Sequence, residues 1–250
     1  MTRYDQRVAV ITGASRGIGA GLVRAFLERG MRVAACARSE PDFPFDADAT
    51  SDARLLYEQV DVTNYDQVCT FAELAERELG PVDLWVNNAG VLDPIGMTRQ
   101  VDASAFRRQV DVNLVGVFHG CQAYLAQLHR DRRHGAIANI GSGASHSAYR
   151  GWGAYCATKA AVDQLTRVMA CEEAAFGNRI FVLAPGIIET DMQTLIRAQR
   201  EEDFPDVARF HALHQEGLLG APESPADAVL RLAFDTSMSL EDPIFDIRDL

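Results

Sequence analysis

Short apolar runs alternate along the chain with longer segments in which apolar residues recur every three or four positions. The short runs predict strands over 8–11, 32–37, 57–60, 84–86, 136–140, 180–183 and 243–247. The longer segments predict helices over 18–29, 65–79, 103–131, 153–176 and 225–235. Because strands and helices alternate, the pattern predicts an α/β fold in which a doubly wound parallel sheet carries helices on both faces.

Two segments depart from this alternation. Residues 39–54 hold many Pro, Asp and Ser residues with little periodicity, which indicates a surface loop or a short helix. Residues 189–217 are charged and are expected to form a helical insertion. Apart from these two segments, the amino-acid composition does not change along residues 1–250 and no segment is repeated, so we expect a single domain.

The overall composition narrows the classes of function. With 48% apolar residues among 250, the chain can bury a full core without disulfides or metals. A net charge of −11 repels nucleic acids and anionic membrane surfaces, so neither partner is expected. The five cysteines form no C-x-x-C motif, and no run is apolar enough for a leader or a membrane span, which indicates a cytoplasmic protein. The histidines are scattered apart from His211 and His214, so no metal site is expected.

A glycine-rich turn, Thr-Gly-Ala-Ser-Arg-Gly-Ile-Gly over 12–19, lies between the first strand and the first helix. Glycines let the backbone approach a phosphate, whose charge meets the free N–H groups and the positive dipole end of the helix. This setting favours a Rossmann-type dinucleotide site over a tight turn that only allows helix-sheet packing. The candidate cofactor residues of the turn are Gly13, Ser15, Arg16, Gly17, Ile18 and Gly19.

The end of the second strand indicates which dinucleotide binds. An acidic residue at that place holds the ribose 2′-hydroxyl of NAD, whereas an arginine accommodates the 2′-phosphate of NADP. Here Arg38 ends the strand, and the first acidic residue after the strand begins is Glu40. Arg16 lies in the glycine turn. We therefore expect NADP(H), the alternative being that both arginines are only solvated. Residues after the third and fourth strands complete the expected cofactor site: Asp61, Val62, Asn88, Ala89 and Gly90.

One residue type occurs only once. Of the 24 basic residues, 23 are arginines and one is a lysine, Lys159. Tyr155 precedes it by four residues, which places both side chains on one face of a helix. A phenol with an ordinary pKa of about 10 needs nearby positive charge to exchange a proton at neutral pH, and Lys159 with an oxidised nicotinamide would supply it. The alternative is that genome composition removed the other lysines and this one survived by chance.

Two further polar residues are expected near this pair. Ser142 follows the strand 136–140, so its hydroxyl reaches the carboxyl edge of the sheet and can bind a carbonyl oxygen beside Tyr155. Asn113 lies in the helix predicted over 103–131 and can hold a water against Lys159. Taken singly, Ser142 is typical of a turn and Asn113 of a helix surface. Their joint order with Tyr155 and Lys159 favours one catalytic site.

In combination these motifs resemble the short-chain dehydrogenase/reductase family over essentially the whole chain. The resemblance implies one dinucleotide-binding catalytic domain, an NADP-dependent oxidoreductase, with Asn113, Ser142, Tyr155 and Lys159 as a catalytic tetrad. Tyr155 is then the general acid in reduction, and Thr190 contacts the nicotinamide carboxamide. The cofactor residues implied in the same way are Tyr155, Lys159, Pro185, Gly186, Ile188 and Thr190.

Some segments resemble two groups within that family, the sepiapterin reductases and the bacterial benzil reductases. The resemblance is carried by residues 151–157 (GWGAYCA), by 190–193 (TDMQ) and by the stretch 197–217. Both groups reduce a ketone adjacent to a second carbonyl with NADPH, so the same reaction is expected here. Sepiapterin reductases hold their substrate with a carboxylate near the C-terminus, and Asp246 occupies the matching place.

Apolar and aromatic residues near the tetrad form the expected substrate side. The substrate-binding candidates are Ser142, Tyr149, Trp152, Tyr155, Ile187, Met192 and Asp246. Further pocket walls are expected from Leu92, Ile95, Ala144 and Leu195, each with a plain core role as the alternative. Two other functions stay open: a reductase of acyl-carrier-protein ketones or hydroxysteroids, and a non-catalytic NADP(H)-binding sensor. The family also implies a homodimer or homotetramer formed through the helices 103–131 and 153–176.

Overall fold

A seven-stranded parallel sheet forms the centre of the computed structural model, which describes residues 4–41 and 54–250. The strands lie in the order β3-β2-β1-β4-β5-β6-β7. Their bounds are β1 (Val8–Thr12), β2 (Arg32–Ala37), β3 (Leu55–Gln59), β4 (Leu84–Asn87), β5 (Ala136–Ile140), β6 (Arg179–Ala184) and β7 (Ile244–Asp246). The predicted α/β fold with a doubly wound parallel sheet is confirmed. Most of the loop or short helix expected over 39–54 lies outside the described residues.

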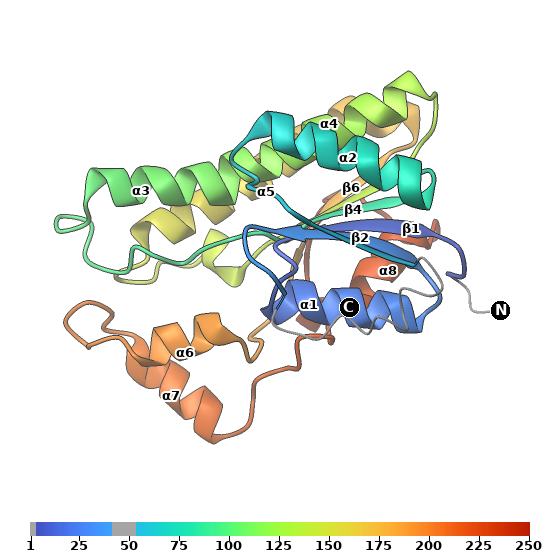
Figure 1. Ribbon diagram of the computed structural model, residues 1–250. Coiled ribbons are helices and arrows are strands. Elements are labelled where there is room, and N and C mark those ends of the chain that lie inside the picture. The colour runs from blue at the N-terminus through green and yellow to red at the C-terminus, as the bar shows by residue number, and fades with distance from the viewer. Residues whose placement is uncertain (1–3, 42–53) are drawn as a thin grey trace.

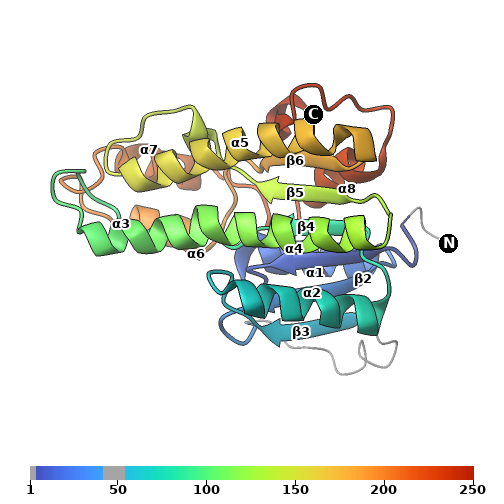
Figure 2. The ribbon, with the colours of Figure 1, turned by 90° about the horizontal axis from the view of Figure 1, so that it is seen from above.

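Helices cover both faces of this sheet (Figure 1). One face carries α1 (Gly17–Glu28) and α8 (Ala226–Phe234). The opposite face carries α2 (Tyr65–Leu79), α4 (Gly116–Arg130) and α5 (Gly153–Glu173), which run side by side in Figure 2. Within the described parts of the chain, no helix has the length and apolar character needed to cross a membrane.

The strand order creates a crevice at one edge of the sheet. From β1 the chain builds outward through β2 and β3, and it then returns to place β4 on the other side of β1. The helices that follow β1 and β4 therefore lie on opposite faces and leave a gap between the carboxyl ends of these two strands. Ligands of open parallel sheets bind at such a reversal, so the fold places the candidate site at the carboxyl ends of β1 and β4.

The helix predicted over 103–131 is interrupted in the structure. It consists of α3 (Ala103–Val110), a π-helical turn (Asp111–Val115) and α4, and Asn113 lies in the middle of the turn. In a π-helical turn each backbone hydrogen bond spans five residues instead of four. The spacing of apolar residues along the sequence does not reveal one such turn within an α-helix. Such turns occur often at functional sites, and here the turn lies beside the crevice.

The predicted insertion 189–217 contains two short helices beyond the carboxyl edge of the sheet, α6 (Asp191–Arg197) and α7 (Val207–Gln215) (Figure 1). Glu189 joins them: one carboxylate oxygen accepts a hydrogen bond of 2.8 Å from Arg197, and the other lies 3.0 Å from Nδ1 of His214. The insertion is attached to the rest of the molecule by stacking of Phe204 on Trp152, with ring centroids 4.7 Å apart.

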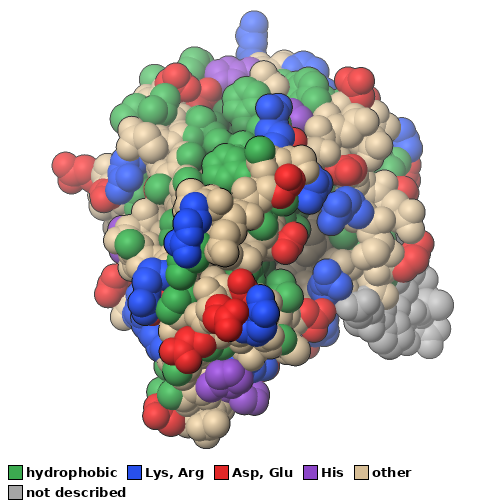
Figure 3. All heavy atoms as spheres, turned by 90° about the vertical axis from the view of Figure 1, so that its left-hand side faces the viewer, with side chains coloured by type: hydrophobic (Ala, Val, Ile, Leu, Met, Phe, Trp, Pro, Cys, Tyr) green, Lys and Arg blue, Asp and Glu red, His purple; other side chains and the backbone are tan. Residues whose placement is uncertain are grey.

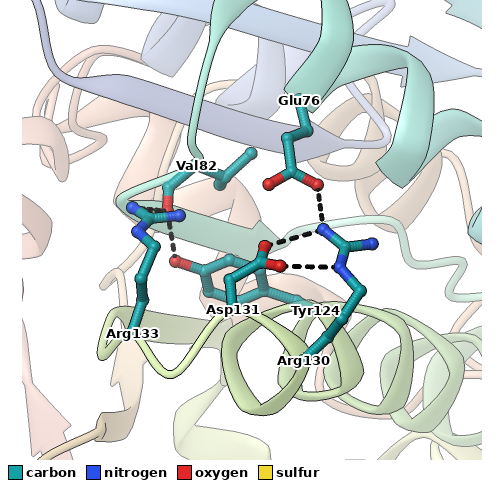
Figure 4. A network of polar contacts seen from close by, with 6 residues as sticks. All are labelled: Glu76, Val82, Tyr124, Arg130, Asp131 and Arg133. Carbon is teal, nitrogen blue, oxygen red and sulfur yellow. Dashed lines mark hydrogen bonds and ion pairs between the residues drawn. The ribbon is translucent and has the colours of Figure 1, made fainter.

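A polar network fixes α4 at the opposite end of the sheet (Figure 4). The hydroxyl of Tyr124 donates a hydrogen bond of 2.8 Å to the carbonyl of Val82, and Arg133 donates to the same carbonyl at 3.1 Å. Arg130 forms an ion pair with Glu76 of α2. These contacts join α4 to α2 and to the segment before β4, far from the crevice.

Candidate active site

One large cavity of about 940 Å³ opens at the carboxyl edge of the sheet, between the glycine turn, α5 and α6. Figure 3 looks onto the end of the molecule at which α3, α6 and α7 lie, where hydrophobic side chains are mixed with charged ones. Most of the residues predicted from the sequence line this cavity. They are Gly13, Ser15, Arg16, Gly17, Ile18, Arg38, Asp61, Val62, Asn88, Ala89, Gly90, Ser142, Tyr149, Trp152, Tyr155, Lys159, Pro185, Gly186, Ile187, Ile188, Thr190, Met192 and Asp246.

The glycine turn has the geometry that a phosphate cradle requires. Gly13 adopts a φ of +66°, and a Cβ placed there would lie 2.5 Å from the Cα of Ala89. The side-chain amide of Asn88 donates hydrogen bonds to the carbonyls of Thr12 and Gly13, at 3.0 and 2.9 Å. Since α1 begins at Gly17 without a side-chain cap, its first N–H groups are available to an anion in the cavity. The turn therefore fits a dinucleotide pyrophosphate.

Gly19 is packed tightly within the turn, and its role as a cofactor contact stays a prediction. It is absent from the cavity wall, and a Cβ at this position would lie 2.4 Å from the carbonyl oxygen of Gly13 and 2.5 Å from Nδ2 of Asn88. Close packing, the alternative considered for the turn, is therefore one reason for a glycine at this position. It lets α1 approach the strand end tightly enough for the turn to form.

Two arginines face the cavity where the adenosine half of a dinucleotide would lie. Arg38 follows β2, and Arg16 belongs to the glycine turn. Nε of Arg16 lies 3.6 Å from the carboxylate of Asp191 at the start of α6, with both side chains mostly exposed. Nearby, one carboxylate oxygen of Asp61 accepts hydrogen bonds from Thr63, at 2.9 Å from its backbone N–H and 2.8 Å from its hydroxyl. This end of the cavity can hold a group with negative charge.

The wall beneath the middle of the cavity brings together three of the four predicted tetrad residues. Ser142 follows β5, while Tyr155 and Lys159 lie one turn apart on α5 with 7% and 6% of their surfaces exposed. Nζ of Lys159 lies 5.7 Å from the centroid of the Tyr155 ring and donates a hydrogen bond of 2.7 Å to the carbonyl of Ile140. Three groups able to donate a proton or a hydrogen bond thus share one wall.

Burial changes the acidity of this pair. It raises the pKa of Tyr155 to about 12, against the opposing effect of a hydrogen bond from Ser142. It lowers the pKa of Lys159 to about 8, against the opposing charge of Asp163. The expectation that Lys159 lowers the pKa of the phenol is therefore not met by the protein groups alone, because loss of solvation is the larger effect. At neutral pH the phenol keeps its proton and the lysine its charge.

Asn113 lies in the helical stretch expected for it, and its side chain binds the backbone beside the cavity. Its side chain does not line the cavity, because both ends of its amide bind the backbone of Val91: Nδ2 donates to the carbonyl and Oδ1 accepts from the N–H, each at 2.8 Å. Nδ2 also lies 3.4 Å from the hydroxyl of Thr158. The two N–H bonds of the amide are thus engaged, while its oxygen accepts one hydrogen bond and can accept a second. Its observed contacts join the π-helical turn to the segment after β4 and to α5.

Aromatic side chains form the outer part of the cavity. Trp152 meets Tyr155 edge to face at 5.7 Å between ring centroids and Tyr149 at 4.9 Å. Phe210 of α7 joins them, with its ring 5.3 Å from Trp152. Neither Phe210 nor Phe204 was predicted from the sequence, since nothing in the local pattern relates the insertion to Trp152. The one feature that could have indicated Phe210 is that it is a large apolar residue within a charged, helical segment.

Two of the four further wall predictions need correction. Leu92 and Ala144 line the cavity as expected. Ile95 is absent from the cavity wall and packs against the cluster that contains Trp152, and Leu195 is 41% exposed on α6 and also absent from the wall. In a helix as short as α6, the spacing of apolar residues does not show which of them faces the cavity. The sequence therefore did not separate Leu195 from Met192, which lines the cavity.

Asp246 lines the cavity, but its carboxylate already has a partner. It accepts hydrogen bonds of 2.9 Å from the backbone N–H of Arg248 and 2.8 Å from Nε of the same residue. These bonds to Arg248 lower the pKa of Asp246. A substrate that used this carboxylate would therefore have to compete with Arg248.

Three known proteins show what this chain is similar to. The benzil reductase ((S)-benzoin forming) of Bacillus cereus is 30% identical over 235 residues, which cover 90% of this chain and 93% of the relative. The 3beta-hydroxysteroid dehydrogenase 1 of Eggerthella lenta is 33% identical over 243 residues, which cover 93% and 89%. The solved structure of carveol dehydrogenase from Mycobacterium avium, in complex with NAD, aligns with a TM-score of 0.82 at 25% identity and covers 99% of this chain and 98% of that chain.

The family comparison agrees with the geometry of the site. The short chain dehydrogenase family matches residues 7–201, a span that contains the glycine turn, Ser142, Tyr155 and Lys159. Among residues 4–41 and 54–250, no group of three or more His, Cys, Asp or Glu side chains is placed to hold a metal. The chain belongs to the short-chain dehydrogenase family of oxidoreductases, which use a nicotinamide cofactor.

Proposed function

We propose that this protein is an NADPH-dependent carbonyl reductase that acts on a ketone adjacent to a second carbonyl. One observation carries the proposal: Ser142, Tyr155 and Lys159 share a single cavity with the glycine turn on one side and an aromatic wall on the other. A benzil reductase covers almost the whole chain at 30% identity, which supports the substrate class.

The cofactor-binding part of the cavity fits NADP(H). Backbone at Gly13 and Gly17 and the first turn of α1 would hold the pyrophosphate. Arg16 and Arg38 would hold the 2′-phosphate from two sides, and this role requires Arg16 to exchange its contact with Asp191 for the phosphate. Thr190 lies beside Gly17, where a Cβ would meet it at 3.3 Å, and would contact the nicotinamide carboxamide. When bound, the cofactor supplies the hydride.

The protein groups supply the proton and polarise the carbonyl. The hydroxyls of Ser142 and Tyr155 donate hydrogen bonds to the carbonyl oxygen, which gains negative charge as its carbon is reduced. The proton of Tyr155 moves to that oxygen and leaves a phenolate, which the Lys159 ammonium stabilises. Water returns a proton to Tyr155 through Lys159, while Asn113 holds the segment after β4 and α5 in register.

The outer part of the cavity selects the substrate. Tyr149, Trp152 and Phe210 offer ring faces and edges to an aromatic group, while Leu92 and Met192 add apolar surface. A flat aryl ketone such as one half of benzil buries its ring against this wall. Its second carbonyl would then lie toward the polar groups that line the same cavity.

A substrate panel tests the proposal. Benzil, other vicinal diketones, simple aryl ketones and 3-ketosteroids are assayed with NADPH and NADH in parallel. We expect diketones with NADPH to give the highest kcat/KM. Tyr155→Phe should lower kcat by on the order of 10²–10⁴-fold and leave the Kd for NADPH within about twofold. Tyr124→Phe, which removes a buried phenol far from the cavity, is the matched control. Full activity of Tyr155→Phe would remove it from the acid role.

A hydroxysteroid is the second candidate substrate class. It is supported by the 33% identity to a 3beta-hydroxysteroid dehydrogenase and by a cavity volume of about 940 Å³ with an apolar outer wall. In the panel, a 3-ketosteroid with a kcat/KM above that of every diketone would favour this class.

We also propose self-association through α4 and α5. Phe118 on α4 and Val168 on α5 are 41% and 45% exposed, so both helices offer apolar surface that a second copy of the chain could cover. Size-exclusion chromatography with light scattering is expected to give a dimer or a tetramer, and a monomer at micromolar concentration would refute this.

A further inference from the structure

A second and smaller cavity of about 200 Å³ lies behind the wall that carries Ser142. Ser142 lines both cavities, so the second one begins directly behind the candidate active site. Its other polar lining includes Ser145 and His146 after β5, Asp163 of α5, and Arg248 near the C-terminus. The volume is enough for several water molecules. A cavity with polar lining therefore adjoins the buried face of α5.

Asp163 is the least satisfied polar group at this place. Only 7% of its surface is exposed, and its Oδ1 atom is fully buried without a hydrogen-bond partner. A buried carboxylate without compensation is costly and is found where another charge offsets it. Asp163 follows Lys159 by four residues, so both side chains lie on the same buried face of α5.

The buried ammonium of Lys159 also lacks a nearby opposite charge among the described residues. The polar contact found for its ammonium is the carbonyl of Ile140, and no carboxylate in the described part of the chain lies within ion-pair distance of it. The negative charge that stabilises this ammonium must therefore come from a carboxylate beyond ion-pair distance, either Asp163 or one of its neighbours.

Other charged groups also lie near Asp163. On α5, Arg167 forms an ion pair with Asp242, and its charge still lowers the pKa of Asp163, by more than the charge of Lys159 does. In the C-terminal segment that lines the second cavity, Asp246 forms an ion pair with Arg248, and Asp249 is exposed. From the short 3₁₀ helix Gly143–Ser145, the hydroxyl of Ser145 contacts Asp163, and the ring of His146 faces the same space. Asp163 is therefore the carboxylate best placed to balance Lys159.

We propose that Asp163 is a positioning residue whose negative charge keeps the Lys159 ammonium charged beneath Tyr155, while the second cavity gives Asp163 room for water. The role assigned to Lys159 in turnover rests on the proposed function, whereas the electrostatic link between Asp163 and Lys159 does not. Burial is the largest effect on both groups, and it raises the pKa of Asp163 and lowers that of Lys159. Against burial, the charge of Asp163 raises the pKa of Lys159, and the charge of Lys159 contributes to lowering the pKa of Asp163.

The single lysine allows a direct test. Protein labelled with [6-¹³C]lysine gives one Cε resonance, that of Lys159, whose chemical shift is followed from pH 5 to pH 11. The wild-type midpoint is expected at a pKa of about 8. Asp163→Asn should lower the midpoint by on the order of one pH unit, because one negative charge on the same helix face is lost.

Two variants serve as controls. Asp242→Asn removes an exposed carboxylate that contacts Arg167 of the same helix and should leave the midpoint unchanged. Asp163→Glu keeps the charge and should restore a midpoint close to that of the wild type. An unchanged midpoint in Asp163→Asn would refute the proposal. If that variant fails to fold, Asp163→Ser is titrated in its place: a midpoint below that of the wild type supports the link, and an unchanged midpoint refutes it.

The pH dependence of kcat/KM separates this proposal from the proposed function. In Asp163→Asn the alkaline limb should move to lower pH by the same amount as the Cε midpoint. A shifted midpoint with an unmoved limb would support the link between Asp163 and Lys159 and would refute the role of Lys159 in turnover.

Discussion

Replacing Gly13 by alanine tests whether the glycine turn is held by close backbone contact. The residue has a φ of +66°, and the new Cβ would lie 2.5 Å from the Cα and 2.8 Å from the N of Ala89. The left-handed conformation alone costs an alanine about 1–2 kcal/mol. Forcing the backbone at Ala89 aside should add about 1–3 kcal/mol.

Gly217 is the matched control, because it has nearly the same φ, +67°, and a Cβ added there would meet no atom within 4 Å. Gly217→Ala therefore carries the conformational cost without the collision. Thermal unfolding followed by circular dichroism should show Gly217→Ala lowering Tm by roughly 2–8 °C and Gly13→Ala by several degrees more. A fluorescence titration should show that only Gly13→Ala weakens NADPH binding, by on the order of ten- to a hundredfold. Equal Tm values for the two variants would refute the reasoning.

Three other predictions concern different parts of the molecule. Arg38→Gln should weaken NADPH binding by about ten- to a hundredfold, since a charge-assisted hydrogen bond contributes about 1.5–3 kcal/mol, and a titration with NADH should show no change. Because burial lowers the pKa of Lys159 to about 8, its ammonium is present below that pH and is lost above it. The kcat/KM for reduction should therefore fall above about pH 8, and a flat profile up to about pH 10 would contradict this. Tyr124→Phe should lower the free energy of unfolding in urea by about 0.5–1.5 kcal/mol without changing turnover, since Arg133 still donates to the Val82 carbonyl.

The features that could be predicted from the sequence depend on residues close together along the chain. Apolar periodicity located every strand of the sheet to within about two residues, because a buried strand or helix face imposes its repeat on neighbouring positions. The glycine turn was identified because a strand, a turn and a helix follow one another directly. The four-residue spacing placed Tyr155 and Lys159 on one helix face, and the structure shows both at the same cavity.

Tertiary structure alone decided the contacts between distant segments and the solvation that they remove. Phe204 of the helical insertion stacks on Trp152, 52 residues earlier in the chain, and Asn113 binds the backbone of Val91. The direction of each pKa shift depends on how completely the folded chain excludes water, which raises the pKa of Tyr155 and lowers that of Lys159. Local patterns specify which face of an element is buried, whereas the identity of the partner and the depth of burial follow from the packing of the whole chain.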